Sequence, residues 1–281
     1  MGNLLSGLEN FGLDNVKEKE IFGEEAKKEP VKMVNKQETV FNEADVIFDK
    51  TYTCPVCDTI IKSKTVKAGK VKLLSVDSDL RPKYQQVDSL KYDAILCNRC
   101  GYAALNRYFS SVTAIQAKAV KEQITKNYKA NIENKEIFSY DDALLRHKMA
   151  LANAMVAYGK NSEKAYICLK LAWLYRGMQE QLVPSESDYQ SRILKLKENE
   201  EECIVNAYEG FKAALSKESF PMCGMDEMTM MYLMAELARR CKRYDESMKL
   251  VSKIFENRFS NDRIKEKARV IKERILEERK A

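Results

Sequence analysis

Apolar residues recur at the three- and four-residue steps of amphipathic helices over residues 106–281. Only four glycines and two prolines interrupt this part of the chain. Pairs of apolar residues mark seven successive helices: Val112 and Ile115, Leu144 and Leu151, Tyr166 and Leu169, Ile204 and Tyr208, Met228 and Met231, Met248 and Phe255, and Ile264 and Ala268. The pattern therefore predicts a mainly α protein built from an array of antiparallel helical hairpins.

Small residues inside the predicted helices resemble the pattern of a tetratricopeptide repeat. Ala207, Phe211 and Ala214 have the four- and three-residue steps of the second helix of such a unit. The match is incomplete, because no glycine follows Leu171 and residues 177–202 separate the two halves of the unit. We therefore expect a tetratricopeptide-like stack, and such stacks commonly leave a concave surface for a partner segment.

Short β-branched and apolar runs precede the helices, in residues 46–105. Residues 59–61 and 70–76 favour strands. Residues 46–48 and 94–96 each lead into a pair of cysteines. Strand, cysteine turn, strands and a second cysteine turn follow one another in the order of a zinc ribbon. Because a segment of this size cannot bury a full core, we expect metal binding to supply much of its folding free energy.

Two C-x-x-C pairs, Cys54 with Cys57 and Cys97 with Cys100, are separated by 39 residues. Two intervening residues let the chain turn tightly, so both sulfurs of a pair can face one metal at about 2.3 Å. Gly101 follows the second pair, where a tight turn often needs a positive φ. Four cysteines close the coordination shell, and no histidine lies near them, so we predict one structural Zn²⁺ held by all four.

Residues 1–45 contain ten acidic and six basic residues, and we predict that they form an acidic, mostly flexible tail. Leu4, Leu8 and Phe11 would fall on one face of a short helix. The alternative is a docking peptide that folds on this protein or on a partner. The expected organisation is therefore a tail over residues 1–45, a zinc-ribbon-like segment over 46–105 and a helical domain over 106–281.

The overall composition is typical of a soluble globular protein. The 281 residues are 45% hydrophobic and 32% charged, with a formal net charge of +6. The sequence has no run of eighteen apolar residues, so we expect no membrane partner. No signal-peptide pattern opens the sequence, and its eight cysteines favour reduced thiols over a disulfide framework. These features predict a cytoplasmic location.

The sequence shows no recognisable catalytic set, and we assign no catalytic residue. His147 is the only histidine, and it lies between Arg146 and Lys148 on a predicted helix. That setting indicates a solvated or half-packed side chain rather than a catalytic base. The glycine-rich phosphate loops and the zinc-protease motif are also absent from the sequence. An enzyme is therefore disfavoured.

Asp77, Asp79, Arg81 and Tyr84 form the only other dense polar cluster in the sequence. The two aspartates are two residues apart and would share one face of a strand, where they could bind a cation or a basic partner. The alternative is that they cap a turn and pair with Arg81 or with nearby lysines. We keep these four residues as a candidate ligand cluster.

Three segments resemble an uncharacterised bacterial family known as DUF2225: Cys54-Pro-Val-Cys57, Asp77-Ser-Asp79-Leu-Arg-Pro-Lys-Tyr84 and Tyr92-Asp-Ala-Ile-Leu-Cys97-Asn-Arg-Cys100-Gly-Tyr-Ala103. The resemblance extends from about Val46 to the C-terminus and is strongest over residues 50–105. It implies a cytosolic bacterial protein with a zinc-ribbon-like start and tetratricopeptide-like helices, and it implies no established activity. Asn98 and Arg99 stand where the family often has a proline. This difference removes none of the four cysteine ligands.

Three functions remain open on the sequence alone. The leading hypothesis is an adaptor in which structural zinc braces a helical array whose groove binds a protein or peptide. A nucleic-acid-binding zinc ribbon is the first alternative, because residues 46–105 hold ten basic and six acidic residues, among them Lys62, Lys64, Lys67, Lys70 and Lys72. The basic residues at 239–243 could also meet nucleic acid or an acidic peptide, although cations are common at helix ends. A metal-dependent or thiol-redox enzyme is the second alternative, and it depends on the cysteines alone.

Overall fold

The structure is a computed structural model that describes residues 41–130, 135–185, 188–258 and 260–280. Asn42–Ala281 forms one compact unit. The predicted acidic tail, with its apolar positions Leu4, Leu8 and Phe11, lies outside the described residues apart from residues 41–45. There the side chain of Asn42 caps a short 3₁₀ helix, Glu43–Val46.

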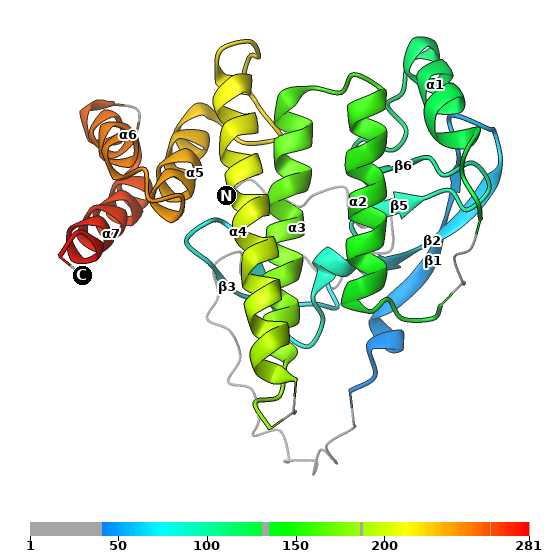
Figure 1. Ribbon diagram of the computed structural model, residues 1–281, viewed down its shortest axis with the longest axis horizontal. Coiled ribbons are helices and arrows are strands. Elements are labelled where there is room, and N and C mark those ends of the chain that lie inside the picture. The colour runs from blue at the N-terminus through cyan, green and yellow to red at the C-terminus, as the bar shows by residue number, and fades with distance from the viewer. Residues whose placement is uncertain (1–40, 131–134, 186–187, 259, 281) are drawn as a thin grey trace, which may run out of the picture. The chain divides into compact units, whose positions relative to one another are not determined.

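Three antiparallel strand pairs precede the α-helices (Figure 1). The pairs are β1 (Ile47–Thr53) with β2 (Ile60–Val66), β3 (Leu73–Val76) with β4 (Pro82–Tyr84), and β5 (Ala94–Leu96) with β6 (Ala103–Leu105). A second 3₁₀ helix, Ser89–Tyr92, leads into β5. Thr53 lies opposite Ile60, and Leu96 lies opposite Ala103. Each cysteine pair therefore forms the turn of one hairpin.

Seven α-helices follow within the described part of the chain (Figure 1). They are α1 (Ala114–Val120), which continues as a π-helix (Lys121–Thr125), α2 (Tyr140–Val156), α3 (Asn161–Gln181), α4 (Tyr189–Leu215), α5 (Glu227–Arg240), α6 (Tyr244–Glu256) and α7 (Asp262–Glu278). This order confirms the predicted mainly α fold, with small strand pairs ahead of a helical array. None of the described helices combines the length and the apolar character that a membrane span requires.

Polar residues at the N-cap positions begin several of the helices. The side chains of Thr113, Ser139, Asp226 and Asn261 accept hydrogen bonds from the first turns of α1, α2, α5 and α7. Helices α3 and α4 are the longest, with 21 and 27 residues. Much of the segment 177–202, which separated the two halves of the expected repeat unit, therefore extends these two helices.

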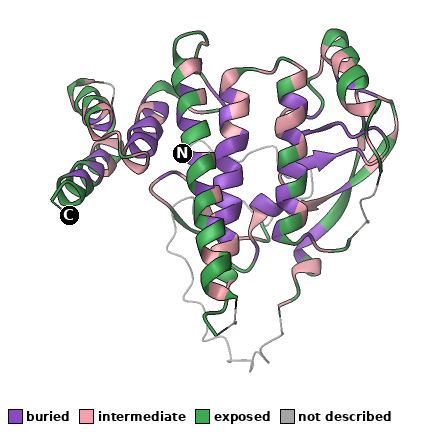
Figure 2. Cartoon of the chain, in the orientation of Figure 1, coloured by how far each residue is buried: buried purple, intermediate pink, exposed green. Residues whose placement is uncertain are grey.

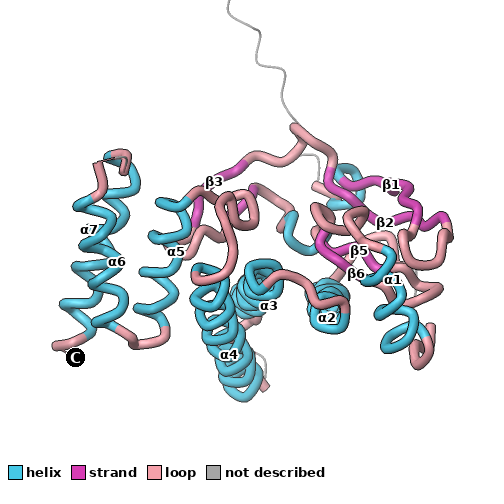
Figure 3. The backbone as a smooth tube through the Cα atoms, turned by 90° about the horizontal axis from the view of Figure 1, so that it is seen from above, coloured by secondary structure: helices cyan, strands magenta, loops and turns pink. Residues whose placement is uncertain are grey.

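Helix α3 lies between α2 and α4, with the strand pairs on one side of it (Figures 1 and 3). It is buried along most of its length (Figure 2), and its Leu169 and Trp173 belong to a core that also includes Leu96 and Leu105 of β5 and β6. The second cysteine hairpin and the long helices therefore share one core. A separate cluster joins α5, α6 and α7.

Helices α3 and α4 approach closely where Gly210 faces Ala165. A Cβ atom built on Gly210 would lie 2.8 Å from the Cβ atom of Ala165, which is closer than carbon atoms can pack. The absence of a side chain at position 210 therefore sets the separation of the two longest helices.

We predict that Gly210→Ala lowers the free energy of unfolding by about 1–3 kcal/mol, because the added methyl group forces α3 and α4 apart. Inside an unconstrained helix the same change would be stabilising by about 1 kcal/mol. Urea unfolding followed by circular dichroism measures the difference. The double variant Ala165→Gly/Gly210→Ala should recover much of the loss, and a single variant as stable as the wild type would contradict this close contact.

Candidate metal centre and the buried ion-pair network

The four cysteines of the two C-x-x-C pairs come together at the ends of their hairpins. Their sulfur atoms all lie within 4.8 Å of one another. The Sγ atoms of Cys54 and Cys100 are 3.6 Å apart, and those of Cys57 and Cys97 are 3.7 Å apart. Sulfurs at the corners of a tetrahedron around Zn²⁺, each about 2.3 Å from the ion, would be about 3.8 Å apart. The cluster therefore could hold a metal ion such as zinc.

The two cysteine turns have the same backbone geometry. The amide of Asp58 donates to the carbonyl of Cys54 at 2.9 Å, and the amide of Gly101 donates to the carbonyl of Cys97 at 2.9 Å. Asp58 has a φ of 58° and Gly101 has a φ of 75°, so both turns end in the left-handed region. Two segments far apart in the sequence thus present their sulfurs from equivalent turns.

Side chains from the helical part hold the second turn in place. The hydroxyl of Thr125 donates to the carbonyl of Cys100 at 2.9 Å, and the amide nitrogen of Asn153 donates to the carbonyl of Gly101 at 3.0 Å. A Cβ atom on Gly101 would lie 2.6 Å from Cγ of Tyr128, so only glycine leaves room for that ring. The helices therefore fix the position of two of the four sulfurs.

The electrostatics of the cluster favour a cation. Hydrogen bonds from the thiols of Cys100 and Cys54 lower the pKa of Cys97. The contacts with Cys54 and Cys97 in turn raise the pKa of Cys100. Protons shared among sulfurs keep some of them neutral, whereas a metal binds them as thiolates. Four thiolates in so small a space require a positive charge between them.

The chemistry of this ligand set is that of a closed site. Cys54, Cys97 and Cys100 are buried and Cys57 is half-buried. Four sulfur ligands fill a tetrahedral shell and leave no position for water or substrate. The remaining four cysteines, Cys168, Cys203, Cys223 and Cys241, do not join the cluster.

The tip of the β3–β4 hairpin brings together three of the four residues of the predicted polar cluster. Asp77, Asp79 and Arg81 belong to this tip, where the amide of Asp77 donates to the carbonyl of Arg81 at 2.8 Å. Tyr84 lies away from the tip, at the end of β4 opposite Leu73. The carboxylates face the helices rather than an open surface, and Asp79 is only 1% exposed.

Arginines from two helices meet the buried carboxylate of Asp79. Arg176 of α3 donates to its two oxygens at 3.0 and 2.5 Å, and Arg240 of α5 donates at 2.8 Å. Glu200 of α4 accepts from Nε of Arg176 at 2.8 Å and also pairs with Arg240. Burial alone would raise the pKa of Asp79, but the hydrogen bonds and charge of Arg176, together with the charge of Arg240, lower it. Both oxygens of Asp79 are thus used by guanidinium groups.

Further polar contacts surround this network. Both terminal nitrogens of Arg81 donate to Glu180 of α3 at 3.1 Å. The hydroxyl of Tyr232 on α5 donates to the carbonyl of Ser78 at 2.6 Å. The hairpin tip is therefore tied to α3, α4 and α5. The sequence placed the carboxylates in one cluster but gave no sign of Arg176 or Glu200, and it flagged Arg240 only as part of a basic run.

His147 departs from the sequence prediction. It is fully buried rather than solvated, because α2 turns this residue toward the core and Nδ1 lies 2.8 Å from the carbonyl of Ala143. Burial lowers the pKa of His147 to about 4, so the ring is neutral near pH 7. The charged residues on either side of it in the sequence, Arg146 and Lys148, therefore do not indicate that the side chain of His147 points into the core.

Some of the lysines in and beside the β1–β2 hairpin already have partners within the protein. Lys62 and Lys64 lie two residues apart on β2 and so share a face. Lys64 pairs with Asp49 at 3.0 Å, and Lys67 donates to the carbonyl of Asp45 at 2.8 Å.

We predict that Cys97→Ser removes most of the bound zinc and lowers the melting temperature by about 10 °C or more, because metal binding contributes folding free energy to the two hairpins. Elemental analysis of the purified protein and thermal unfolding measure the two effects. Cys241→Ser, which changes a half-buried cysteine outside the cluster, is the matched control and should retain one zinc per chain. Full zinc content in Cys97→Ser would refute the four-sulfur site.

We predict that Asp79→Asn lowers the free energy of unfolding by about 3–5 kcal/mol, because it removes the more deeply buried of the two carboxylates that balance Arg176 and Arg240. Chemical denaturation at pH 7 measures the change. Asp49→Asn, which breaks only the surface pair with Lys64, should cost less than about 1 kcal/mol.

The same variant has a pH signature. Because the folded pKa of Asp79 is lower than its unfolded value, the stability it contributes is present above about pH 4 and is lost as the pH falls through the folded pKa. The free energy of unfolding of Asp79→Asn should therefore depend less on pH than that of the wild type in this acidic range. Identical plots of unfolding free energy against pH would argue against the network.

Comparisons with known proteins identify the family but no characterised relative. No curated protein and no solved structure gives a significant match to this chain. A family model described as "Uncharacterized protein conserved in bacteria" matches residues 47–275, which include both cysteine pairs, the hairpin with Asp79 and nearly all of the helical array. The chain therefore belongs to this bacterial family, DUF2225.

Proposed function

We propose that this protein is a cytoplasmic protein-binding scaffold, with one structural zinc ion in the four-cysteine site and a docking groove along α2, α3 and α4. The occupant of the groove is an acidic amphipathic helix of a partner protein. The observation that carries the proposal is an open groove with an apolar floor and a mostly basic rim. The closed sulfur shell supports a structural rather than a catalytic role for zinc.

The groove extends along α3, where residues of α2 and α4 form its sides. Two adjoining hollows of about 360 and 450 Å³ share Lys148, Tyr175 and Asn199, so they form one continuous depression. Leu171 and Tyr175 of α3 contribute to its lining. Leu145 and Met155 of α2 stand at its side and are 44% and 60% exposed, which is unusual for large apolar residues unless a partner covers them.

The charges around the groove indicate the kind of partner. Its lining includes four basic residues and two acidic ones, namely Lys148, Lys164, Arg192, Lys195, Asp141 and Glu202. An amphipathic helix would place apolar side chains on the floor and acidic side chains against this rim. The groove lies on a different face of α3 from Arg176 and Glu180, whose face is already occupied by the β3–β4 hairpin tip.

We predict that the double variant Lys148→Glu/Lys195→Glu weakens the binding of an acidic amphipathic helical peptide by at least tenfold, because two attractive charges become repulsive. A displayed library of such peptides supplies the probe, and fluorescence anisotropy of a selected peptide measures its affinity. Leu145→Ala should weaken binding without changing its dependence on salt, since it removes apolar contact only.

Lys272→Glu on α7 is the control, because this exposed lysine lies outside the groove. A library that yields no peptide sensitive to the double variant would defeat the proposal. If the protein instead binds duplex DNA with steep salt dependence, and the double variant Lys62→Glu/Lys64→Glu abolishes that binding, the nucleic-acid function replaces this one.

A further inference from the structure

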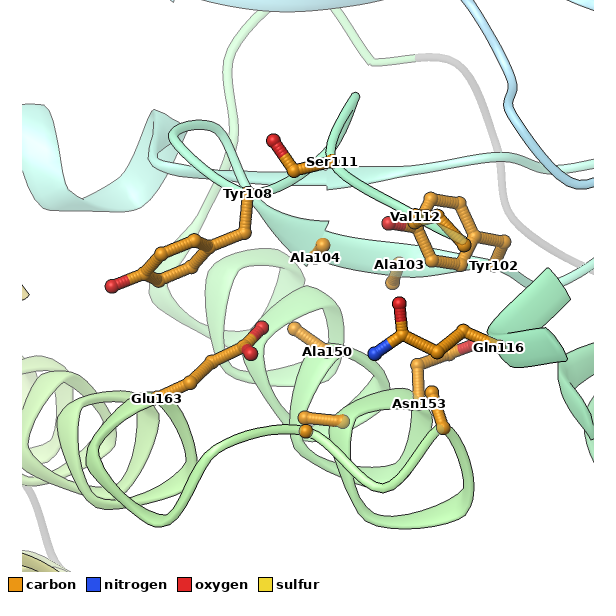
Figure 4. A pocket seen from close by; sticks show the side chains of 13 residues that line it. Tyr102, Ala103, Ala104, Tyr108, Ser111, Val112, Gln116, Ala150, Asn153 and Glu163 are labelled. Atoms are coloured by element: carbon orange, nitrogen blue, oxygen red, sulfur yellow. The ribbon is translucent and has the colours of Figure 1, made fainter. Parts of the chain in front are cut away.

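A small cavity lies directly beside the second cysteine turn. Residues of β6, α1, α2 and α3 line it, and it has a volume of about 60 Å³ (Figure 4). One water requires roughly 10–15 Å³ on this measure, so the cavity has room for about four to six water-sized groups. Alanines 103, 104 and 150 form part of its wall and leave the space open. The polar groups in it determine what it can bind.

Asn153 supplies a buried acceptor that has no partner. Its amide nitrogen donates to the carbonyls of Gly101 and Met149 at 3.0 and 2.9 Å. The opposite orientation of the amide would place oxygen against two carbonyl oxygens, so these contacts fix Oδ1 as the other atom. Asn153 is 1% exposed, and Oδ1 has no hydrogen-bond partner. A buried carbonyl oxygen without a donor is costly, so this atom needs an N–H or O–H group from a ligand or water.

Glu163 supplies a negative charge at the other side of the cavity. Its carboxylate points into the space from α3, whereas Asn153 and Gln116 extend into it from the opposite side (Figure 4). No hydrogen bond or ion pair joins Glu163 to another described residue. A Cβ atom on Gly159 would lie 3.1 Å from Oε2 of Glu163, so the glycine leaves room beside this oxygen. Burial raises the pKa of Glu163, and the charges of Lys160 and Lys164 offset this only in part, so a bound cation would offset the rest.

Gln116 adds a donor next to Asn153. Its Oε1 accepts from the amide and the hydroxyl of Thr113 at 3.0 and 3.2 Å, as part of the cap of α1. Its NH₂ group is therefore the end that extends into the cavity (Figure 4). One end of the space thus holds an acceptor and a donor side by side, and the other end holds a carboxylate.

We propose that this cavity binds a small amino alcohol, with its ammonium group on Glu163 and its hydroxyl group between Asn153 and Gln116. A hydroxyl can donate to Oδ1 of Asn153 and accept from the NH₂ of Gln116 at the same time, which neither an ammonium group nor a methyl group can do. The ammonium group gives Glu163 a charge-assisted hydrogen bond.

Isothermal titration of the zinc-loaded full chain with ethanolamine at pH 7.5 tests the proposal. We expect saturable binding with a Kd between about 0.05 and 10 mM, the range open to a four-atom ligand. Ethylamine, which lacks the hydroxyl, should bind at least about fivefold more weakly. Choline, which has the hydroxyl and the charge but no N–H donor, should not bind. Absence of saturation by ethanolamine, or equal binding of choline, would overturn the site.

A matched pair of variants assigns the binding to this cavity. Glu163→Gln keeps the shape of the side chain and removes its charge, so it should weaken ethanolamine binding at least about tenfold. Glu198→Gln makes the same change on the exposed surface of α4 and should leave the affinity unchanged. Zinc content and melting temperature confirm that both variants are folded. Equal affinity in Glu163→Gln and the wild type would reject the assignment, as would a crystal soaked in ethanolamine with no density within about 3.2 Å of Oδ1 of Asn153.

Discussion

The gathering of four sulfur atoms is the constraint on which the N-terminal half of this structure depends. Cys54 and Cys57 belong to a hairpin of two seven-residue strands, whereas Cys97 and Cys100 end a hairpin whose strands have three residues each. Neither hairpin could be stable alone in water. A single ion bound to both turns would join segments 39 residues apart and would hold the first hairpin on the second.

The second hairpin transmits that constraint to the helices. Its carbonyls at Cys100 and Gly101 receive hydrogen bonds from Thr125 and Asn153, and its strands share a core with α3. Hydrogen bonds and a shared core therefore connect the cysteine site to the helical array. Zinc in this position would act as a structural bridge, and the features open to partners would lie elsewhere on the same framework.

A second tie of a different kind joins the β3–β4 hairpin to the helices. Here the buried charge of Asp79 is balanced by Arg176 and Arg240, and Glu200 balances the two arginines in turn. Such a network gives little net stability, because each charge loses its hydration on burial, but each member is costly to lose once the others are in place. It fixes where the hairpin tip meets α3, α4 and α5. The open groove on another face of α3 and the cavity beside Asn153 remain as the accessible features.

Local patterns in the sequence predicted seven helices over residues 106–281, strand-forming runs within residues 46–105 and the four cysteines of the cluster, but not how the strands pair. Helical periodicity and the C-x-x-C spacing are properties of neighbouring residues, so they can be read without knowing the fold. The polar cluster was found for the same reason, although Tyr84 proved to lie apart from the other three residues.

Only the tertiary structure decided which distant residues meet. Arg176, Glu200 and Arg240 join Asp79 because three helices and a hairpin converge, and nothing in the spacing of these residues announces it. His147 is buried because its helix turns it toward the core, against the indication of its charged neighbours in the sequence. The unpaired oxygen of Asn153 likewise exists only because Gly101 and Met149 hold the other end of the amide. Sequence patterns encode the periodicity of an element, whereas the partner of a buried polar group depends on how whole elements pack.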